Sequence, residues 1–426
     1  MNLFASGVYA LKSASRNVFV YPNKEMYKMI LMKRYCIALF AFCLTCILTA
    51  DAAERKMAVA DDATPQPIVS FTKEQHPAEW YAIQERLWRA EVNRTPADDE
   101  AWINLWHATR YRMMFVEEQE DKDVLLALAD EVHTKVPDSY ADYIVDYWCK
   151  AIYGLRTGDV HMSEAIRMRP ERIASYPDYV AWLLRTGDEA LLTDILTRWY
   201  QSGQFSATLL NYFYNVLVGL DDKAILFVNG DVPTYACLML QYAKGLFMDK
   251  KIICCGLLYS AAYRTQLCRE LSIQELPEPA CYSEQDTKAW EEKAYSQIIH
   301  ETERPVYFNA VVMNLPSFTD KLYSEGLVYR YSEQRYDNLS AKRLNYEERY
   351  LTDYLWETFS PETYRDSAYK LNLNYIPCFK SLLDWYDQTD DKRHYRALHR
   401  MMKRIVDRTP NLTDDERQAY YEEIAR

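Results

Sequence analysis

The stretch AILFVNGDVPTY, residues 224–235, carries the clearest structural signal in this chain. Five apolar residues end abruptly in Asn229-Gly230-Asp231, and Pro233 and Thr234 then open a segment with helical periodicity. A continuous apolar run bounded by turn residues is typical of a strand buried on both faces, and proline is tolerated in the first turn of a helix. The stretch therefore predicts a buried strand, a tight turn and a helix in succession.

Further apolar runs follow in the sequence: KIICCGLL (251–258), RPVYFNAVV (304–312) and GLVYRY (326–331). Between the predicted strand at 224–228 and the run at 251–258, the residues from Pro233 to Phe247 show the apolar periodicity of a helix. Short apolar runs separated by helical segments predict β-α-β units and a parallel sheet covered on both faces. We therefore expect a small Rossmann-like parallel α/β module over residues 221–332.

Helical patterns fill the chain on both sides of this module. Proline recurs at positions 96, 137 and 170, spaced 41 and 33 residues apart, in TPADDEAW, VPDSYADY and RPERIASYPDYVAW. A proline before an aromatic-bearing helix, at a spacing of about 34 residues, resembles degenerate tetratricopeptide helical hairpins, and an ordinary α-hairpin array is the alternative. We expect an N-terminal helical repeat domain over residues 73–220 and C-terminal helical hairpins over residues 333–426. The fold class is mixed and mainly α, in agreement with only 10 glycines in 426 residues.

The N-terminal region has the pattern of a signal peptide. MKRYCIALFAFCLTCILTADAAERK begins at Met32, with two basic residues, an apolar core of thirteen residues and an A-x-A cleavage signal ending at Ala52. This core suits a signal peptide better than a membrane span, and a short membrane anchor is the alternative. Since a signal peptide belongs at the extreme N-terminus, residues 1–31 indicate a start codon assigned too early. We expect a linker over residues 53–72, a mature protein in the periplasm, secreted or at the cell surface, and no stable membrane insertion after cleavage.

The charge of the mature chain argues against nucleic-acid binding. The formal net charge is −12, and the first 52 residues carry six Lys/Arg and two Asp/Glu, so the remainder carries −16. This excess of negative charge repels the phosphate backbone of nucleic acids. The mature chain contains no HExxH, no GxSxG and no CxxC pair at zinc-site spacing, so its motifs indicate neither a metal nor a cofactor.

Seven cysteines remain after the predicted leader, an odd number that leaves at least one thiol unpaired. Several of them fall in segments that are predicted to be buried, where a thiol packs as a small apolar group. We expect few or no disulfides, and Cys268 with Cys281 is the pair that could form one.

The order of these segments resembles a family of bacterial proteins of unknown function. The resemblance covers roughly residues 77–426 and is carried by LLNYFYNVL, AILFVNGDVPTY, LMLQYAKGL and KKIICCGLL, followed by ERPVYFNAVV and LYSEGLVYRY. The family occurs in secreted proteins with tetratricopeptide-like helices. It is also similar to the soluble C-terminal part of multi-pass membrane proteins whose membrane half is similar to protein O-mannosyltransferases.

The resemblance implies an exported protein of a Gram-negative bacterium, without an assigned reaction. This chain departs from the family at two places. Val232 and Pro233 follow Asp231 where the family usually has further polar residues, and Cys254 stands in the second strand where the family has an asparagine. If those polar groups bind a ligand in the family, the departures imply weaker binding here or none.

Asp231 is the first candidate for a functional group. Ligands of open parallel sheets bind beyond the carboxyl ends of the strands, where Asp231 should lie with Asn229 beside it and Thr234 in the first helical turn. The alternative is structural, because a carboxylate at a helix N-terminus caps backbone N–H groups and contributes about 1 kcal/mol. Glu325 and Arg330 could reach the same edge of the sheet, or form a surface ion pair.

These patterns favour an exported, non-catalytic binding or scaffolding protein of the cell envelope that recognises a protein partner or a glycan. Helical arrays present a concave face to partners, and a composition rich in Tyr and Trp suits stacking on sugar rings, although core packing explains most of it. The alternative is an enzyme acting on a glycan or another polar substrate, with Asp231 as metal ligand or general base. Further polar side chains around Asp231 in a pocket would favour the enzyme.

Overall fold

The structure is a computed structural model, and it describes residues 64–70, 74–114, 121–153, 160–279, 283–312, 318–356 and 365–425. These residues form two compact units, one ending at Ala174 and the other beginning at Ser175. The predicted leader, the start-codon segment and Cys281 lie outside the described residues. Within the ranges given above, no helix is long and apolar enough to cross a membrane.

The first unit consists of helices. Its helices are α3 (Ala78–Arg94), α4 (Asp99–Met113), α5 (Asp121–Lys135), α6 (Tyr140–Tyr153) and α7 (Val160–Met168). Successive helices pack against each other, α3 on α4, α5 on α6 and α6 on α7. The Trp102 indole donates a hydrogen bond to the carbonyl of Pro96 (2.8 Å), so the aromatic residue of the first proline motif holds the turn before its own helix. Trp106 stacks with Trp148 in the core, with ring centroids 6.2 Å apart.

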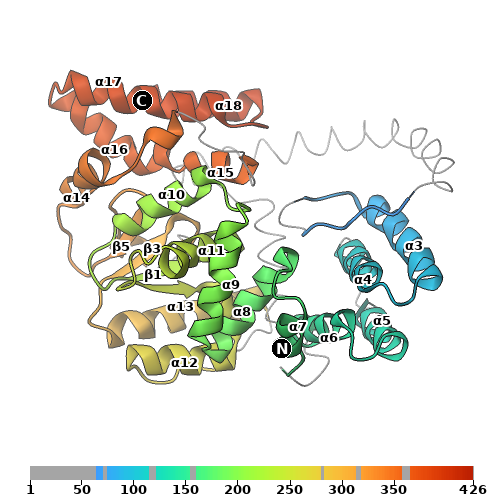
Figure 1. Cartoon of the computed structure of the whole chain (residues 1–426). Coiled ribbons are helices and arrows are strands. Elements are labelled where there is room, and N and C mark those ends of the chain that lie inside the picture. The colour runs from blue at the N-terminus through green and yellow to red at the C-terminus, as the bar shows by residue number, and fades with distance from the viewer. Residues whose placement is uncertain are drawn as a thin grey trace. The chain divides into compact units, whose positions relative to one another are not determined.

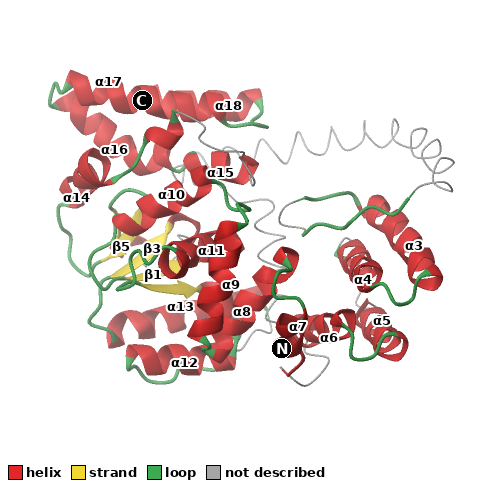
Figure 2. Ribbon diagram, viewed as in Figure 1, coloured by secondary structure: helices red, strands yellow, loops and turns green. Residues whose placement is uncertain are grey.

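The second unit combines helices with one sheet, as Figures 1 and 2 show. Its strands are β1 (Ile225–Val228), β2 (Lys251–Cys254), β3 (Val306–Asn309), β4 (Leu322–Ser324) and β5 (Val328–Tyr331). Its α-helices are α8 (Tyr176–Thr186), α9 (Glu189–Gln201), α10 (Ala207–Val218), α11 (Asp231–Leu238), α12 (Ala261–Leu271), α13 (Glu284–Glu301), α14 (Asn338–Leu344), α15 (Arg365–Asn372), α16 (Tyr375–Gln388), α17 (Lys392–Arg408) and α18 (Asp414–Ala425). The chain as described is thus mainly helical, as the sequence predicts.

The sheet is mixed, so the prediction of a parallel sheet is wrong for part of it. The strand order is β2-β1-β3-β5-β4. β1 pairs in parallel with both β2 and β3, whereas β5 pairs antiparallel with β3 and with β4. The run GLVYRY is therefore the second strand of a hairpin and not part of a β-α-β unit. The physical reason is the tight turn at Gly326 (φ +115°), which joins β4 directly to β5.

Helices cover the sheet on both faces, with α10 and α11 on one side and α13 on the other (Figure 2). Phe227 of β1 stacks with Phe308 of β3 at 4.9 Å, and both rings contact Tyr295 of α13. Every residue of β1 is buried, which explains its continuous apolar sequence. On the other side of α10, helices α14 to α18 form a further helical layer (Figure 1).

The division between the two units lies before the position that the sequence predicts. The predicted boundary at residue 220 falls inside the second unit, because α8, α9 and α10 pack on elements of the α/β part. α8 contacts α12, α9 contacts the π-helical segment Met239–Ala243, and α10 contacts α11. In sequence, α8, α9 and α10 look like a continuation of the N-terminal array, but in the structure they belong to the unit that contains the sheet.

Candidate functional site

The turn after β1 presents the predicted polar residues at the carboxyl end of the strand. Gly230 occupies the N-cap position of α11 with φ +88°, and Asp231 is the first residue of the helix. Asn229 and Asp231 are exposed, whereas Thr234 is buried and its hydroxyl donates to the Gly230 carbonyl (2.8 Å). A carboxylate in the first turn interacts favourably with the helix dipole. Asp231 therefore stabilises the start of α11 as its first helical residue and not as the N-cap residue, which is Gly230.

The end of β2 lies beside this turn. Cys254, the last residue of β2, lies near Asp231 and Thr234 of this turn. Burial is the main reason that the pKa of Cys254 is raised, and the negative charge of Asp231 raises it further. The thiol is therefore protonated at neutral pH and is not an activated nucleophile.

The carboxyl edge of β1 and β2 thus brings together a carboxylate, a hydroxyl and a thiol. Within the described residues, no group of three or more His, Cys, Asp or Glu side chains could hold a metal ion. The polar residues that the sequence places near Asp231 are there, but Asn229 and Asp231 project from the surface. This arrangement fits a helix start better than a catalytic centre.

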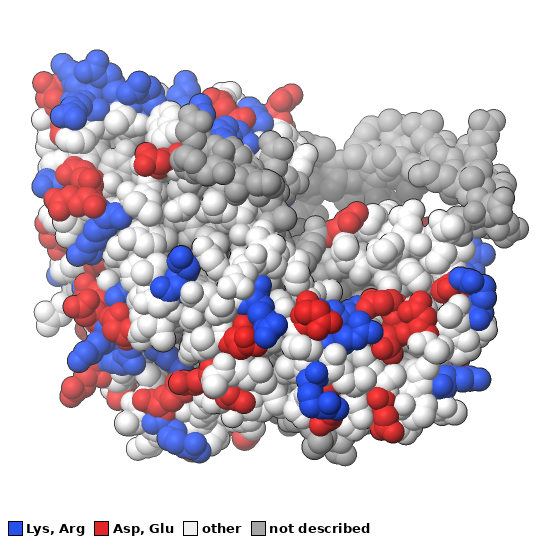
Figure 3. Space-filling model, in the orientation of Figure 1, with Lys and Arg blue, Asp and Glu red and all other residues white. Residues whose placement is uncertain are grey.

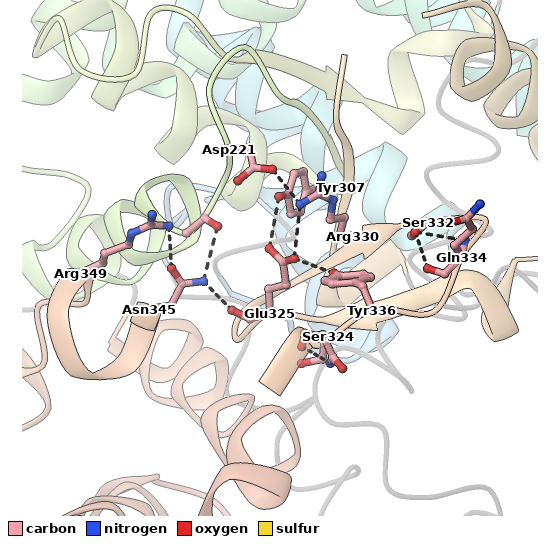
Figure 4. Close-up of polar contacts among 12 residues, drawn as sticks. Asp221, Tyr307, Ser324, Glu325, Arg330, Ser332, Gln334, Tyr336, Asn345 and Arg349 are labelled. Atoms are coloured by element: carbon pink, nitrogen blue, oxygen red, sulfur yellow. Dashed lines mark hydrogen bonds and ion pairs between the residues drawn. The ribbon is translucent and has the colours of Figure 1, made fainter. Parts of the chain in front are cut away.

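Glu325 and Arg330 do come together, in a polar cluster on the β4–β5 hairpin that Figure 4 shows. The carboxylate of Glu325 accepts hydrogen bonds from the hydroxyls of Tyr336 (2.6 Å) and Tyr307 (3.2 Å). Arg330 is the register partner of Tyr307, and its Nη1 lies 3.7 Å from Oε1 of Glu325 and 2.8 Å from Oδ2 of Asp221. The cluster therefore joins the hairpin to β3 and to the segment before β1.

This cluster is a buried carboxylate with its hydrogen-bonding capacity taken up by the protein. The side chain of Glu325 is 4% exposed, and burial raises its pKa against the opposing effects of Tyr336 and Arg330. Because Arg330 reaches Asp221 before β1 while Asp231 follows β1, the two predicted groups lie at opposite ends of that strand. The Glu325–Arg330 pair has a structural role, close to the ion pair that the sequence offered as the alternative, although Glu325 is buried and Arg330 is only partly exposed.

A cavity of about 250 Å³ lies beside the edge strand β2, between α8, α9, the π-helical segment and α12. Its lining includes the buried side chains of Leu192, Leu238, Ile252, Tyr263 and Leu267. Polar and charged side chains form the rest of the wall. These are Glu189, Gln241, Tyr242, Asp249, Lys250, Lys251, Gln266, Glu270 and Arg304.

Opposite charges balance in the lining of this cavity, where Glu189, Asp249 and Glu270 are matched by Lys250, Lys251 and Arg304. Glu270 forms an ion pair with Lys251, and its Oε1 accepts a hydrogen bond from Nε2 of Gln266 (3.0 Å). The pKa of the Tyr242 hydroxyl is raised, chiefly by burial and in addition by the negative charges of Glu189 and Glu270. Tyr242 therefore stays protonated and can donate a hydrogen bond, and the cavity offers donors and acceptors beside apolar side chains.

Sequence reasoning missed this cavity completely. Its walls come from residues 183 to 304, and each polar residue looks like an ordinary surface residue of its own segment. One local signal exists, since Gly187 ends α8 with φ +80° and a Cβ there would meet the Gln266 amide at 3.1 Å. A glycine after a helix, however, is common as a cap and does not by itself indicate a cavity.

No protein-family model, no curated protein and no solved structure matches this chain. The geometry of the candidate site therefore stands without a relative to interpret it.

Proposed function

We propose that this protein is an exported, non-catalytic binding protein of the cell envelope, and that the cavity beside β2 takes a small glycan unit. The single observation that carries the proposal is a cavity lined by both apolar and polar side chains. A sugar ring has an apolar C–H face and hydroxyls around its edge, so it can use both kinds of surface at once. At about 250 Å³ the cavity is smaller than the ~300–1,000 Å³ typical of sites for drug-sized ligands, so it suits a single sugar unit.

The charged groups of the cavity match a neutral sugar better than a charged one, because three carboxylates and three cations line it. Glu189 and Glu270 both lie near Tyr242, and Lys251 is already paired with Glu270. Lys250 is likewise paired with Asp249, so each lysine of the lining already has a carboxylate partner and attracts a phosphate only weakly. We therefore expect hydroxyl recognition by Gln266, Tyr242 and the carboxylates, without a cofactor.

The same proposal assigns roles to the rest of the chain. We propose that α3 to α6 are degenerate tetratricopeptide-like hairpins that bind a protein partner, and that β2-β1-β3 with its helices is a Rossmann-like module. Pairwise packing of successive helices and the parallel 2-1-3 strand order support these assignments. Export rests on the signal-peptide pattern at Met32–Ala52. Sequencing the N-terminus of the protein recovered from the periplasm would test it, since a start near Ala53 is expected and an intact Met32 would contradict it.

Glycan binding is testable by thermal shift on residues 53–426 with a panel of neutral, amino, uronic and phosphorylated sugars. A ligand present at 100 times its Kd stabilises the folded state by about 2.7 kcal/mol, which a melting curve resolves. Gln266→Ala removes a hydrogen-bonding group from the cavity and should weaken binding at least tenfold. Gln297→Ala is the matched control, because Gln297 is a surface glutamine of α13 that bonds to the backbone of Gln274 and Glu275.

Two results would overturn this function. One is a melting curve that no sugar of any class moves, and the other is a shift that Gln266→Ala leaves unchanged. Equal loss of the shift in Gln297→Ala would also count against the cavity as the site.

A second candidate is an enzyme acting on a polar substrate at the carboxyl edge of the sheet, with Asp231 as general base. The observation in its favour is the proximity of Asp231, Thr234 and Cys254. Asp231→Asn separates the two proposals, because the amide keeps the size of the side chain but cannot accept a proton as a base. Sugar binding that persists in Asp231→Asn favours the cavity, whereas hydrolysis of a glycoside or ester library that this variant abolishes favours the enzyme.

A further inference from the structure

Helix α17 carries a row of cations on its solvent face. Its sequence is KRHYRALHRMMKRIVDR, and its inner face packs Leu398, Met401, Met402, Ile405 and Val406 into the core. The exposed side includes Arg393, Arg396, Arg400 and Lys403, which we call the α17 cation row. Figure 3 shows Lys and Arg side chains gathered over this helix. The row stands out because the mature chain carries a net charge of −16.

The four cations of the row are not neutralised by carboxylates. None of them forms an ion pair with Asp or Glu among the residues that the structure describes. Arg396 and Arg400 donate only to backbone carbonyls one turn earlier, at Lys392 and Arg396. Lys403 lies over the ring of Tyr421 at 5.6 Å.

The other charged groups of α17 and its N-terminus have partners outside the row, and Asp407, one turn after Lys403, accepts a hydrogen bond from the Tyr421 hydroxyl. Asp390 pairs with Lys392, and Asp391 caps the helix through the N–H of His394 and also binds its ring. The remaining arginines of α17, Arg404 and Arg408, donate to backbone carbonyls near Leu355 and serve the fold. The row is therefore a free positive strip and not part of a surface ion-pair network.

The geometry of the row points to a linear ligand. The residues from Arg393 to Lys403 span ten helical steps, which is about 15 Å along the axis, with a cation at nearly every turn. Beside them, the rings of Tyr395 and His399 stack at 5.6 Å and offer an aromatic surface. Regularly spaced cations next to an aromatic pair suit a chain that carries one anionic group per unit and a ring to stack.

Other polyanions fit less well. A membrane-surface helix inserts its apolar face into the bilayer, but the apolar face of α17 is buried in the core. Among the described residues, the exposed large apolar side chains all lie outside α17. Nucleic acid is less favoured because the signal-peptide pattern at Met32–Ala52 predicts export from the cytoplasm, where nucleic acids are concentrated.

We propose that the α17 cation row binds an anionic polysaccharide, with Arg393, Arg396, Arg400 and Lys403 contacting carboxylate or sulfate groups of successive sugars. This surface is separate from the cavity beside β2, and the inference does not depend on that cavity. The rest of the acidic molecule repels a longer stretch of the polymer, so the contact is limited to a short segment.

The test uses heparin and polygalacturonate as anionic chains and dextran as the neutral chain, with residues 53–426. Wild type should bind both anionic chains at about 50 mM salt and should not bind dextran. With four cations and a slope of about −0.7 per cation, a fourfold rise in salt should weaken binding roughly 50-fold. The variant R393Q/R396Q/R400Q/K403Q should lose binding at least tenfold, and its buried face is untouched.

The matched control removes four exposed cations that do not share a face, K223Q/K244Q/R269Q/K293Q. It has the same net charge as the α17 variant, so retained binding in the control supports a defined surface. Equal loss in both variants overturns the proposal, because net charge alone would then explain the binding. It is also overturned if wild type binds neither anionic chain, or binds phosphatidylglycerol vesicles or a single-stranded oligonucleotide more tightly than either polysaccharide.

Discussion

Lys342 of α14 is a buried lysine, and its replacement gives the sharpest test of the electrostatics of this fold. The residue is 4% exposed, and its Nζ donates a hydrogen bond to the Ser381 hydroxyl (2.8 Å). No carboxylate forms an ion pair with it among the described residues, and burial lowers its pKa from 10.5 to about 8 while the neighbouring Cys378 opposes the shift. At pH 7 the fold therefore carries a desolvated ammonium group.

The size of the effect follows from the pKa difference. Lowering a pKa from 10.5 to about 8 corresponds to about 3 kcal/mol, at about 1.36 kcal/mol per pH unit. Below pH 8 the lysine is protonated in both the folded and the unfolded state, so the buried charge destabilises the folded state by its full amount. Between pH 8 and pH 10.5 the unfolded state binds more protons than the folded state, so stability rises with pH across this window.

Lys342→Met keeps the length of the side chain and removes the charge. We expect this variant to be more stable than wild type at pH 7, since apolar replacements of buried charges are often stabilising. The advantage should shrink by about 3 kcal/mol between pH 7 and pH 10.5. Urea unfolding of wild type and variant at each pH measures the difference, and the titration of other groups cancels because both proteins share them.

Lys392→Met is the control, because the side chain of Lys392 is 75% exposed. It should leave the pH dependence of stability as in wild type. Wild type and Lys342→Met curves that stay parallel from pH 7 to pH 10.5 would refute the reasoning, because the ammonium of Lys342 would then have an ordinary pKa in the folded protein.

Three further substitutions test the tertiary structure. Gly326→Ala should lower the free energy of unfolding in urea by more than about 2 kcal/mol, because φ is +115° and the new Cβ would lie 2.6 Å from the Tyr350 hydroxyl. The control Gly245→Ala, with φ +64° and no atom within 4 Å, should lower it less, and equal losses would contradict the predicted steric overlap. Asn215→Ala should lower the free energy of unfolding by about 2–3 kcal/mol, because the buried amide donates to the Leu351 carbonyl at 2.7 Å and accepts from the Leu351 N–H at 2.8 Å. A decrease below about 0.5 kcal/mol would show that water replaces the amide. Glu325→Gln should gain stability relative to wild type as pH rises above 4.5, because the raised pKa of Glu325 makes the folded state bind the proton more tightly than the unfolded state does. Thermal melts at pH 4.5 and 7 in which the two proteins differ in melting temperature by the same amount would argue against it.

Local patterns in the sequence predicted the elements of the α/β unit well. The strand predicted at 224–228 is β1, and the strands predicted within 251–258, 304–312 and 326–331 are β2, β3 and β5. The prediction failed where an apolar run continued beyond its strand. β2 ends at Cys254, and the run from Cys255 continues as a 3-10 helix, because apolar side chains are equally well buried in either conformation.

The candidate site was predicted less well, for a different reason. Asp231 and Thr234 could be placed at the end of β1 because they follow it directly in the chain. Glu325 and Arg330 were grouped with them, but Arg330 binds Asp221 at the other end of the strand. Antiparallel pairing of β5 with β3 carries Arg330 to that end, and a short sequence run does not contain strand direction.

The amino-acid sequence by itself determined the helical character, the buried strands and their approximate bounds, because periodicity and turn residues act between neighbours in the chain. Only the tertiary structure decided the strand order, the direction of the hairpin, the cavity beside β2 and the burial of Lys342. These features depend on contacts between segments far apart in the sequence, such as Glu189 with Tyr242 and Lys342 with Ser381. Burial, and with it the cost of a charge or the shape of a cavity, is a property of the packed molecule and not of any single segment.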